Sequence, residues 1–188
     1  MMSQMQEAPP PLPPDEPVLR AAVAMFLRDG WIDARALAAE AGIGRATLYR
    51  RYGDRDRLIG EAIWAIATTE FAQIYPRSRG QGADKVADLV HAMLSTSAQL
   101  PAMRRFVAEH PDTALRVMTS RDGVIQDRIV ETVSRLIQSE IGEPDDIDAP
   151  TLAYAVVRVA ESFYYRELLT GQPTDISAAT TIIRRLLR

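Results

Sequence analysis

The sequence contains no cysteine, so disulfide bonds and thiolate metal sites are excluded. Its two histidines, His91 and His110, leave little material for a histidine metal site or a Ser-His catalytic pair. No apolar run reaches the roughly 18 residues that span a bilayer. Residues 1–17 have neither the basic leader nor the apolar core of a signal peptide. We therefore expect a cytoplasmic protein without metal, cofactor or membrane contact.

Catalytic patterns are also scarce. Paired carboxylates, clusters with metal-ligand spacing, an activated nucleophile and a phosphate-cradling glycine loop do not stand out. An enzyme is therefore poorly supported. Sustained strand alternation and hairpin turn signals are lacking as well.

Apolar residues instead recur with helical spacing after residue 17. The pattern predicts an all-α protein of about nine helices, among them short helices over 34–41 and 45–52 and one long helix over 151–170. Six of the twelve prolines fall within residues 1–17, which predicts a disordered arm rather than a Pro-rich docking ligand. A loop over 76–82 marks the break between a small and a larger helical domain. We divide the chain into this arm, a domain over 18–60 and a domain over 61–188.

Positive charge is concentrated in the small domain. Residues 18–60 hold eight arginines and five acidic residues, a net charge of +3, whereas the whole chain carries −3. Local positive charge is what phosphate neutralisation requires. An acidic protein can therefore still present a DNA-binding segment.

The stretch from Asp33 to Ile59 has the pattern of a helix-turn-helix, whose second helix enters the DNA major groove. Asp33 is a good N-cap for the first helix, Gly42 makes the turn, and Asp54 caps the helix that follows the motif. In the second helix Leu48 and Tyr52 lie four residues apart and face inward. The outward arginines indicate DNA binding; a merely solvated charged face is the alternative.

Residues 41–59, AGIGRATLYRRYGDRDRLI, resemble the DNA-binding signature of the TetR family of transcriptional regulators. The detailed match covers about 40 residues, and the rest agrees in helix layout. Family members often have a phosphate-contacting threonine where this chain has Asp33, and the preceding loop is about two residues shorter. A carboxylate repels phosphate, so that contact is not carried over. Residues 158–172, RVAESFYYRELLTGQ, also look similar to a lactone-responsive branch known as quorum-signal-degradation regulators.

The resemblance implies roles for the basic helix. Tyr49 and Arg55 would contact phosphates, and Arg45 and Arg50 are candidates for guanine because a guanidinium can bond O6 and N7 together. Methyl contacts to thymine would come from the two small residues of that helix. The full set of expected DNA-binding residues is Arg45, Ala46, Thr47, Tyr49, Arg50, Arg51 and Arg55.

The larger domain is read as a ligand-binding and dimerisation domain. An apolar cavity with a few polar groups is the usual small-molecule site, and its candidate lining residues are Trp64, Phe71, Met93, Met103, Phe106, Met118, Arg158, Glu161, Ser162 and Tyr165. Arg158 and Glu161 lie three residues apart and can pair. They would anchor a ligand, or form an ion pair at a dimer interface; the apolar positions, taken singly, fit a plain core equally well.

A two-fold dimer places two recognition helices on successive groove faces. In the family the last two helices form the dimer seam, and the apolar candidates there are Val156, Val159, Phe163, Ile182, Ile183 and Leu186. The leading hypothesis is a one-component repressor that binds a palindromic operator as a homodimer and is released by a small, largely apolar effector, such as a lactone or acyl compound. The alternative is a helical small-molecule-binding or interaction module that has lost DNA binding.

Overall fold

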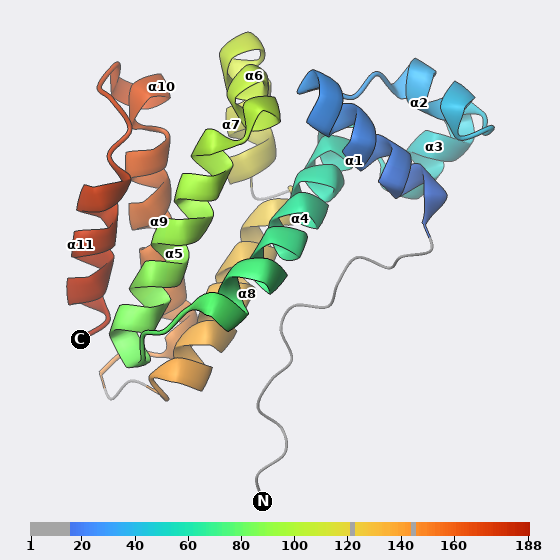
Figure 1. Ribbon diagram of the computed structural model, residues 1–188. Helices are drawn as coiled ribbons and strands as arrows, with labels where there is room; N and C mark the ends of the chain where they lie inside the picture. The colour runs from blue at the N-terminus through green and yellow to red at the C-terminus, as the bar shows by residue number, and fades with distance from the viewer. Residues whose placement is uncertain (1–15, 121–122, 144–145) are drawn as a thin grey trace, which may run out of the picture. The chain divides into compact units, whose positions relative to one another are not determined.

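A computed structural model describes residues 16–120, 123–143 and 146–188 of the chain (Figure 1). Apart from its last two residues, the predicted Pro-rich arm lies outside this part, and Pro17 is the first residue of a helix. The described residues form eleven α-helices, one 3-10 helix and no strand. The helices are α1 (Pro17–Asp29), α2 (Ala34–Glu40), α3 (Arg45–Tyr52), α4 (Arg55–Ile74), η1 (Tyr75–Arg77), α5 (Gly82–Gln99), α6 (Pro101–Glu109), α7 (Pro111–Thr119), α8 (Val124–Glu140), α9 (Ala149–Tyr164), α10 (Arg166–Thr170) and α11 (Ile176–Leu186).

The all-α prediction is confirmed, but the expected single helix over 151–170 is wrong. The chain leaves helical geometry at Tyr165, where φ is −90° and ψ is 13°, and this break separates α9 from α10. No proline or glycine marks the position. The Tyr165 side chain is buried and packs edge-on against Tyr164, with ring centroids 5.0 Å apart. The break therefore coincides with a buried side chain, and helical spacing alone does not reveal it.

The chain forms two compact units. The first unit comprises the described part of residues 10–69 and 97–127, and the second unit comprises that of residues 70–96 and 128–188. Helices α6 and α7 thus belong to the first unit, although the sequence-based division at residue 60 places them in the larger domain. Helices α4, α5 and α8 each have residues in both units.

Local chemistry fixes the short helices of the first unit. Gly30 ends α1 with a left-handed backbone, φ +71°, and its N–H donates to the carbonyl of Phe26. The Asp33 carboxylate caps α2 by accepting the N–H groups of Arg35 and Ala36 at 2.7 and 2.9 Å. Asp54 likewise accepts the N–H of Arg57 at 2.8 Å at the start of α4. The two N-caps predicted from the sequence, Asp33 and Asp54, are confirmed.

The core of the first unit is built from aromatic and aliphatic side chains of α1, α2, α3, α4 and α6. Phe26 of α1 and Phe106 of α6 are fully buried and meet edge-to-face, with centroids 5.5 Å apart. Leu37 of α2 and Leu48 of α3 are also fully buried. Burial of each such side chain contributes roughly 1.5–3 kcal/mol to folding. Packing therefore holds the three short N-terminal helices together with α6.

The second unit has its own core around α9. Its buried members include Val86, Leu89, Ile137, Leu152, Ala153, Val156, Val157 and Ile183. Helices α9 and α11 lie side by side (Figure 1). Alanines at 149, 153 and 160 leave room for close approach of neighbouring helices to α9.

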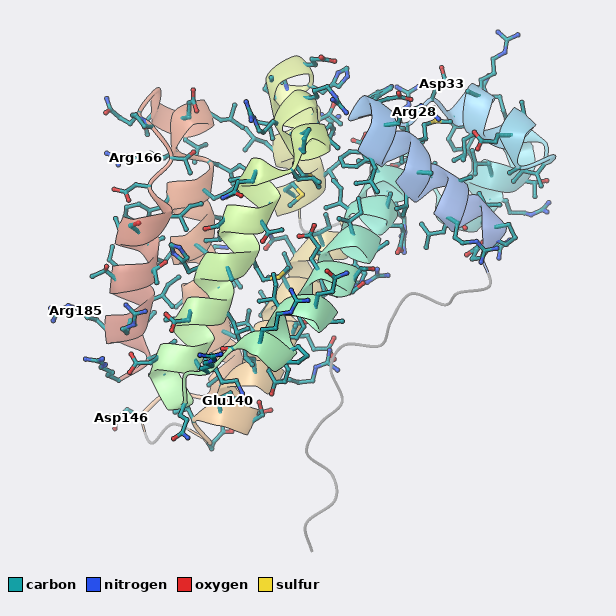
Figure 2. All side chains as sticks on the ribbon, in the orientation of Figure 1. Arg28, Asp33, Glu140, Asp146, Arg166 and Arg185 are labelled. Carbon is teal, nitrogen blue, oxygen red and sulfur yellow. The ribbon has the colours of Figure 1, made fainter. Side chains whose placement is uncertain are left out.

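Polar contacts join the helices of this unit at its edges. The Glu140 carboxylate, labelled in Figure 2, lies 2.7 Å from Lys85 Nζ and accepts the Tyr75 hydroxyl at 2.9 Å. Burial and this hydrogen bond raise the pKa of Tyr75. Arg184 of α11 lies 2.5 Å from Asp88 and 3.1 Å from Asp84, both on α5. No helix in the described ranges is both long and apolar enough to cross a membrane.

Candidate nucleic-acid interface

The predicted helix-turn-helix is formed by α2, a short turn and α3. Gly42 supplies the left-handed residue of the turn, with φ +65°, and the N–H of Ile43 donates to the carbonyl of Ala38 at 3.0 Å. A Cβ added at Gly42 would meet no heavy atom within 4 Å. This position therefore needs glycine for its backbone angle and not for space.

Helix α3 has one buried face and one exposed face. Leu48 is fully buried and Tyr52 is buried, as predicted. Arg45, Ala46 and Arg50 are exposed. The remaining expected contacts, Thr47 and Tyr49, are half-buried. The helix thus presents basic and small side chains outward, which is the face a recognition helix offers to base edges.

The arginines of α3 differ in their contacts. The Arg45 guanidinium lies 5.9 Å from the centroid of the Tyr49 ring. Within the described residues, no hydrogen bond or ion pair engages Arg50. Arg51 instead pairs with Glu16, with Nη2 and Oε1 2.6 Å apart, and lies 5.9 Å from the Tyr52 ring. Arg50 is therefore available as it stands, whereas Arg51 must leave a carboxylate before it contacts DNA.

Glu16 is a residue that the sequence analysis missed. It is the N-cap residue of α1, and its carboxylate lies beside both Arg51 and Tyr52. Burial, followed by the neighbouring Glu16, raises the pKa of Tyr52 strongly. The sequence carried no local signal for this contact, because 35 residues separate Glu16 from Arg51.

Arg55 opens α4 directly after its cap, Asp54, and is exposed. Its guanidinium lies 5.3 Å from the centroid of the Trp31 ring, in the loop between α1 and α2. Asp33, at the start of α2 (Figure 2), is held as a cap. The N–H groups of Ala36 and Arg35 lower the pKa of its carboxyl, to which the charge of Arg55 adds. An ionised carboxylate repels phosphate, so we expect no phosphate contact from Asp33.

Comparison with protein-family models gives two matches. The model of the bacterial regulatory proteins of the tetR family matches residues 18–62, and the Tetracyclin repressor-like C-terminal domain model matches residues 81–188, more than half of the chain. The chain belongs to the TetR family. As a member of this family it is a DNA-binding transcriptional regulator and not an enzyme. Comparison with curated proteins gives no match.

Comparison with solved structures gives further matches. The transcriptional repressor QsdR of R. erythropolis, from the TetR family, is 24% identical and covers 90% of this chain and 92% of its own, with a TM-score of 0.82. This likeness shows the fold. The multidrug binding protein EbrR complexed with imidazole is 18% identical over 91% of this chain and 93% of its own, with a TM-score of 0.47. A TetR-like regulator from Rhodococcus sp. RHA1 is 22% identical over 90% and 91%, with a TM-score of 0.44.

The candidate ligand-site residues are divided between the two units of this TetR-family fold. Trp64, Met103, Phe106 and Met118 belong to the first unit, and Phe71, Met93, Arg158, Glu161, Ser162 and Tyr165 belong to the second. Phe106 packs in the core against Phe26. The Ser162 hydroxyl donates to the carbonyl of Val159 on its own helix. Burial raises the pKa of Tyr165 well above its ordinary value.

The predicted pairing of Arg158 with Glu161 is confirmed, with Nη2 and Oε2 2.5 Å apart. The Arg158 guanidinium also lies 5.3 Å from the ring of Tyr154, which is 55% exposed. Two helical turns of α9 therefore present a tyrosine, an arginine and a glutamate as one connected set at the edge of the second unit.

The candidate seam residues fall into three groups. Val156 and Ile183 are fully buried in the core of the second unit, so their side chains are not available to a second copy of the chain. Val159 and Phe163 are half-buried. Ile182 and Leu186 on α11 are each 42% exposed. The exposed pair is available to a second copy of the chain.

Proposed function

We propose that this TetR-family regulator is a one-component repressor that binds a palindromic operator as a homodimer and is released by a small, largely apolar effector. The observation that carries the proposal is the outward face of α3, where Arg45, Ala46 and Arg50 are exposed above the buried Leu48. Exposed arginines on the second helix of a helix-turn-helix fit base readout in the major groove.

Contacts to the DNA backbone complete this interface. Tyr49 of α3 and Arg55 of α4 donate to phosphates, and Thr47 and Ala46 offer methyl groups to thymine. Arg50, whose guanidinium is not engaged within the described residues, reads guanine. Arg51 adds positive charge near the backbone while it is held by Glu16. Phosphate contacts then set affinity and orientation, and the arginine fork sets sequence preference.

Dimerisation uses the exposed apolar residues of α11 together with neighbouring α9. Ile182 and Leu186 lie one turn apart and are exposed, which supports a helical seam. Arg158 is about one-third exposed, and its position beside the exposed Tyr154 supports a role for the ion pair at this seam rather than in a ligand site. One helix-turn-helix binds DNA weakly, so the dimer is what gives an operator its two half-sites.

The effector binds in the C-terminal domain, and the candidate chemistry is a lactone or another acyl compound. To release DNA, the effector must bind the conformation without DNA more tightly than the DNA-bound one. The similarity of residues 158–172 to the lactone-responsive branch supports this class.

Selection of bound duplexes from a random pool tests the proposal. A palindromic consensus, with a dimer by light scattering, is the expected result; loss of the complex with acyl-homoserine lactones or fatty acyl compounds would identify the effector class. Affinity must fall steeply with salt, because phosphate contacts release counterions. DNA affinity that is absent or insensitive to salt would instead support a binding module that has lost DNA recognition.

A further inference from the structure

Three side chains of the first unit form a continuous row. The Arg55 guanidinium lies 5.3 Å from the Trp31 ring centroid. The Trp31 ring in turn stacks on the His110 imidazole, with centroids 3.9 Å apart and planes inclined by 30°. Arg55 opens α4, Trp31 lies between α1 and α2, and His110 lies between α6 and α7. The row therefore links the proposed phosphate contact to the junction of α6 and α7.

The place of Trp31 is set by its neighbours in the chain. Gly30 brings the end of α1 so close to α6 that an added Cβ would lie 2.8 Å from Arg105 Cβ. Ile32, on the other side of Trp31, is fully buried, and Asp33 is committed to capping α2. The indole is thus held on both sides by buried or bonded residues, and it cannot move without disturbing them.

His110 is similarly fixed. Its backbone N–H donates to the carbonyl of Phe106 at 2.9 Å, and its backbone carbonyl accepts the N–H of Ala114 at 2.8 Å. His110 is therefore both the C-cap residue of α6 and the N-cap residue of α7. These backbone bonds fix the position from which its ring stacks on Trp31. Phe106 flanks the same cluster, with its centroid 6.3 Å from that of Trp31.

Arg55, in contrast, is exposed at the end of a long side chain with many rotamers. A guanidinium over an aromatic face is stabilised there, while its edge N–H groups stay free to donate. The nearby Asp33 carboxylate is tied to the N–H groups of Arg35 and Ala36. Among the described residues it forms no ion pair with Arg55, so the indole and not a carboxylate holds the guanidinium.

We infer that Trp31 is a positioning residue for DNA binding, which holds the Arg55 guanidinium ready for a phosphate while His110 braces the indole. This inference rests on the proposed DNA-binding function. It assigns a functional role to a loop residue outside the helix-turn-helix pattern, and it connects Arg55 through Trp31 to His110 at the α6–α7 junction.

A double-mutant cycle on the full-length protein tests it, with a random-sequence DNA duplex as probe and salt varied from about 50 to 200 mM. We expect Arg55→Gln to lower the salt slope by about 1, as loss of one phosphate contact does. Trp31→Leu should weaken binding about two- to fivefold and lower the slope in the same direction. Trp31→Phe, which keeps an aromatic face, should retain most of the affinity. In the Arg55→Gln background, Trp31→Leu should have no further effect.

Circular dichroism and thermal unfolding establish that each variant is folded. If Trp31→Leu unfolds, His110→Ala replaces it in the same cycle, and its effect should also vanish in the Arg55→Gln background. Equal losses with and without Arg55 would overturn the inference, since they would show a general structural role. An unchanged salt slope in Arg55→Gln would overturn it too, while DNA binding by the wild type would leave the proposed function intact. A wild type without salt-dependent affinity would overturn both.

Discussion

Replacement of Gly30 by alanine should destabilise the protein more than the same replacement at Gly42. Gly30 has φ +71°, where an alanine costs about 1–2 kcal/mol. Its Cβ would also lie 2.8 Å from Arg105 Cβ and 2.9 Å from the Ala102 carbonyl oxygen. Both atoms belong to the frame of α6 and cannot rotate away. Such overpacking costs about 1–3 kcal/mol more, so we expect a total loss of about 2–5 kcal/mol.

Gly42→Ala is the matched control. Gly42 has nearly the same backbone angle, φ +65°, but an added Cβ there meets no heavy atom within 4 Å. Only the conformational cost of about 1–2 kcal/mol remains. Gly42→Asn should cost less still, because asparagine tolerates the left-handed region. The difference between the two alanine variants therefore measures the close approach of α1 to α6.

Thermal unfolding by circular dichroism, at one fixed protein concentration, gives the comparison. For a chain of this size, Tm falls by about 2–4 °C per kcal/mol. Gly30→Ala should lower Tm clearly further than Gly42→Ala. Equal shifts would refute the reasoning, because they would show that α6 yields to the new methyl group at no cost.

Further predictions concern DNA binding, the core, dimerisation and acid stability. Arg50→Ala should weaken gel-shift binding at one base pair by about 1–3 kcal/mol, whereas Arg55→Ala should weaken binding to all sequences; loss of neither complex would refute the assignments. Ile183→Ala should lower the free energy of unfolding by about 2–5 kcal/mol in urea titrations, while Ile182→Asp should instead shift the light-scattering mass towards the monomer. Folding lowers the pKa of Asp33, so its ionised carboxylate stabilises the folded protein above the ordinary pKa of about 3.9. This stabilisation is lost as the pH falls through the lower pKa of the folded state. Asp33→Asn should therefore flatten the dependence of Tm on pH below about pH 4.

The features predicted correctly from the sequence are those set by near neighbours in the chain. Asp33 and Asp54 begin helices through bonds to residues within three positions, and helical spacing correctly predicted that Leu48 and Tyr52 are buried. The pairing of Arg158 with Glu161 is of the same kind. Such contacts follow from backbone geometry, which the residue types and their spacing already specify.

The features that were missed depend on residues far apart in the sequence. Glu16 reaches Arg51, and Trp31 stacks on His110, because packing of whole helices brings them together. The break at Tyr165 likewise lacks a glycine or proline to announce it. Trp31 directly follows Gly30, the C-cap of α1, but this position in the sequence does not show which surface the ring covers.

The first unit extends beyond the part of the chain that the N-terminal family model matches. The N-terminal model ends at residue 62, but three contacts from beyond it hold the DNA-binding helices in place. Arg105 donates to the carbonyl of Arg28 at 2.6 Å and caps the C-terminus of α1. Arg116 lies 2.6 Å from Asp56 in the first turn of α4, and Phe106 fills the space beside Phe26. A fragment ending at residue 62 would expose Phe26 and lose both arginine contacts. The folding unit that presents α3 to DNA is therefore larger than the sequence motif that identifies it, and substitutions in α6 or α7 can alter DNA binding without touching DNA.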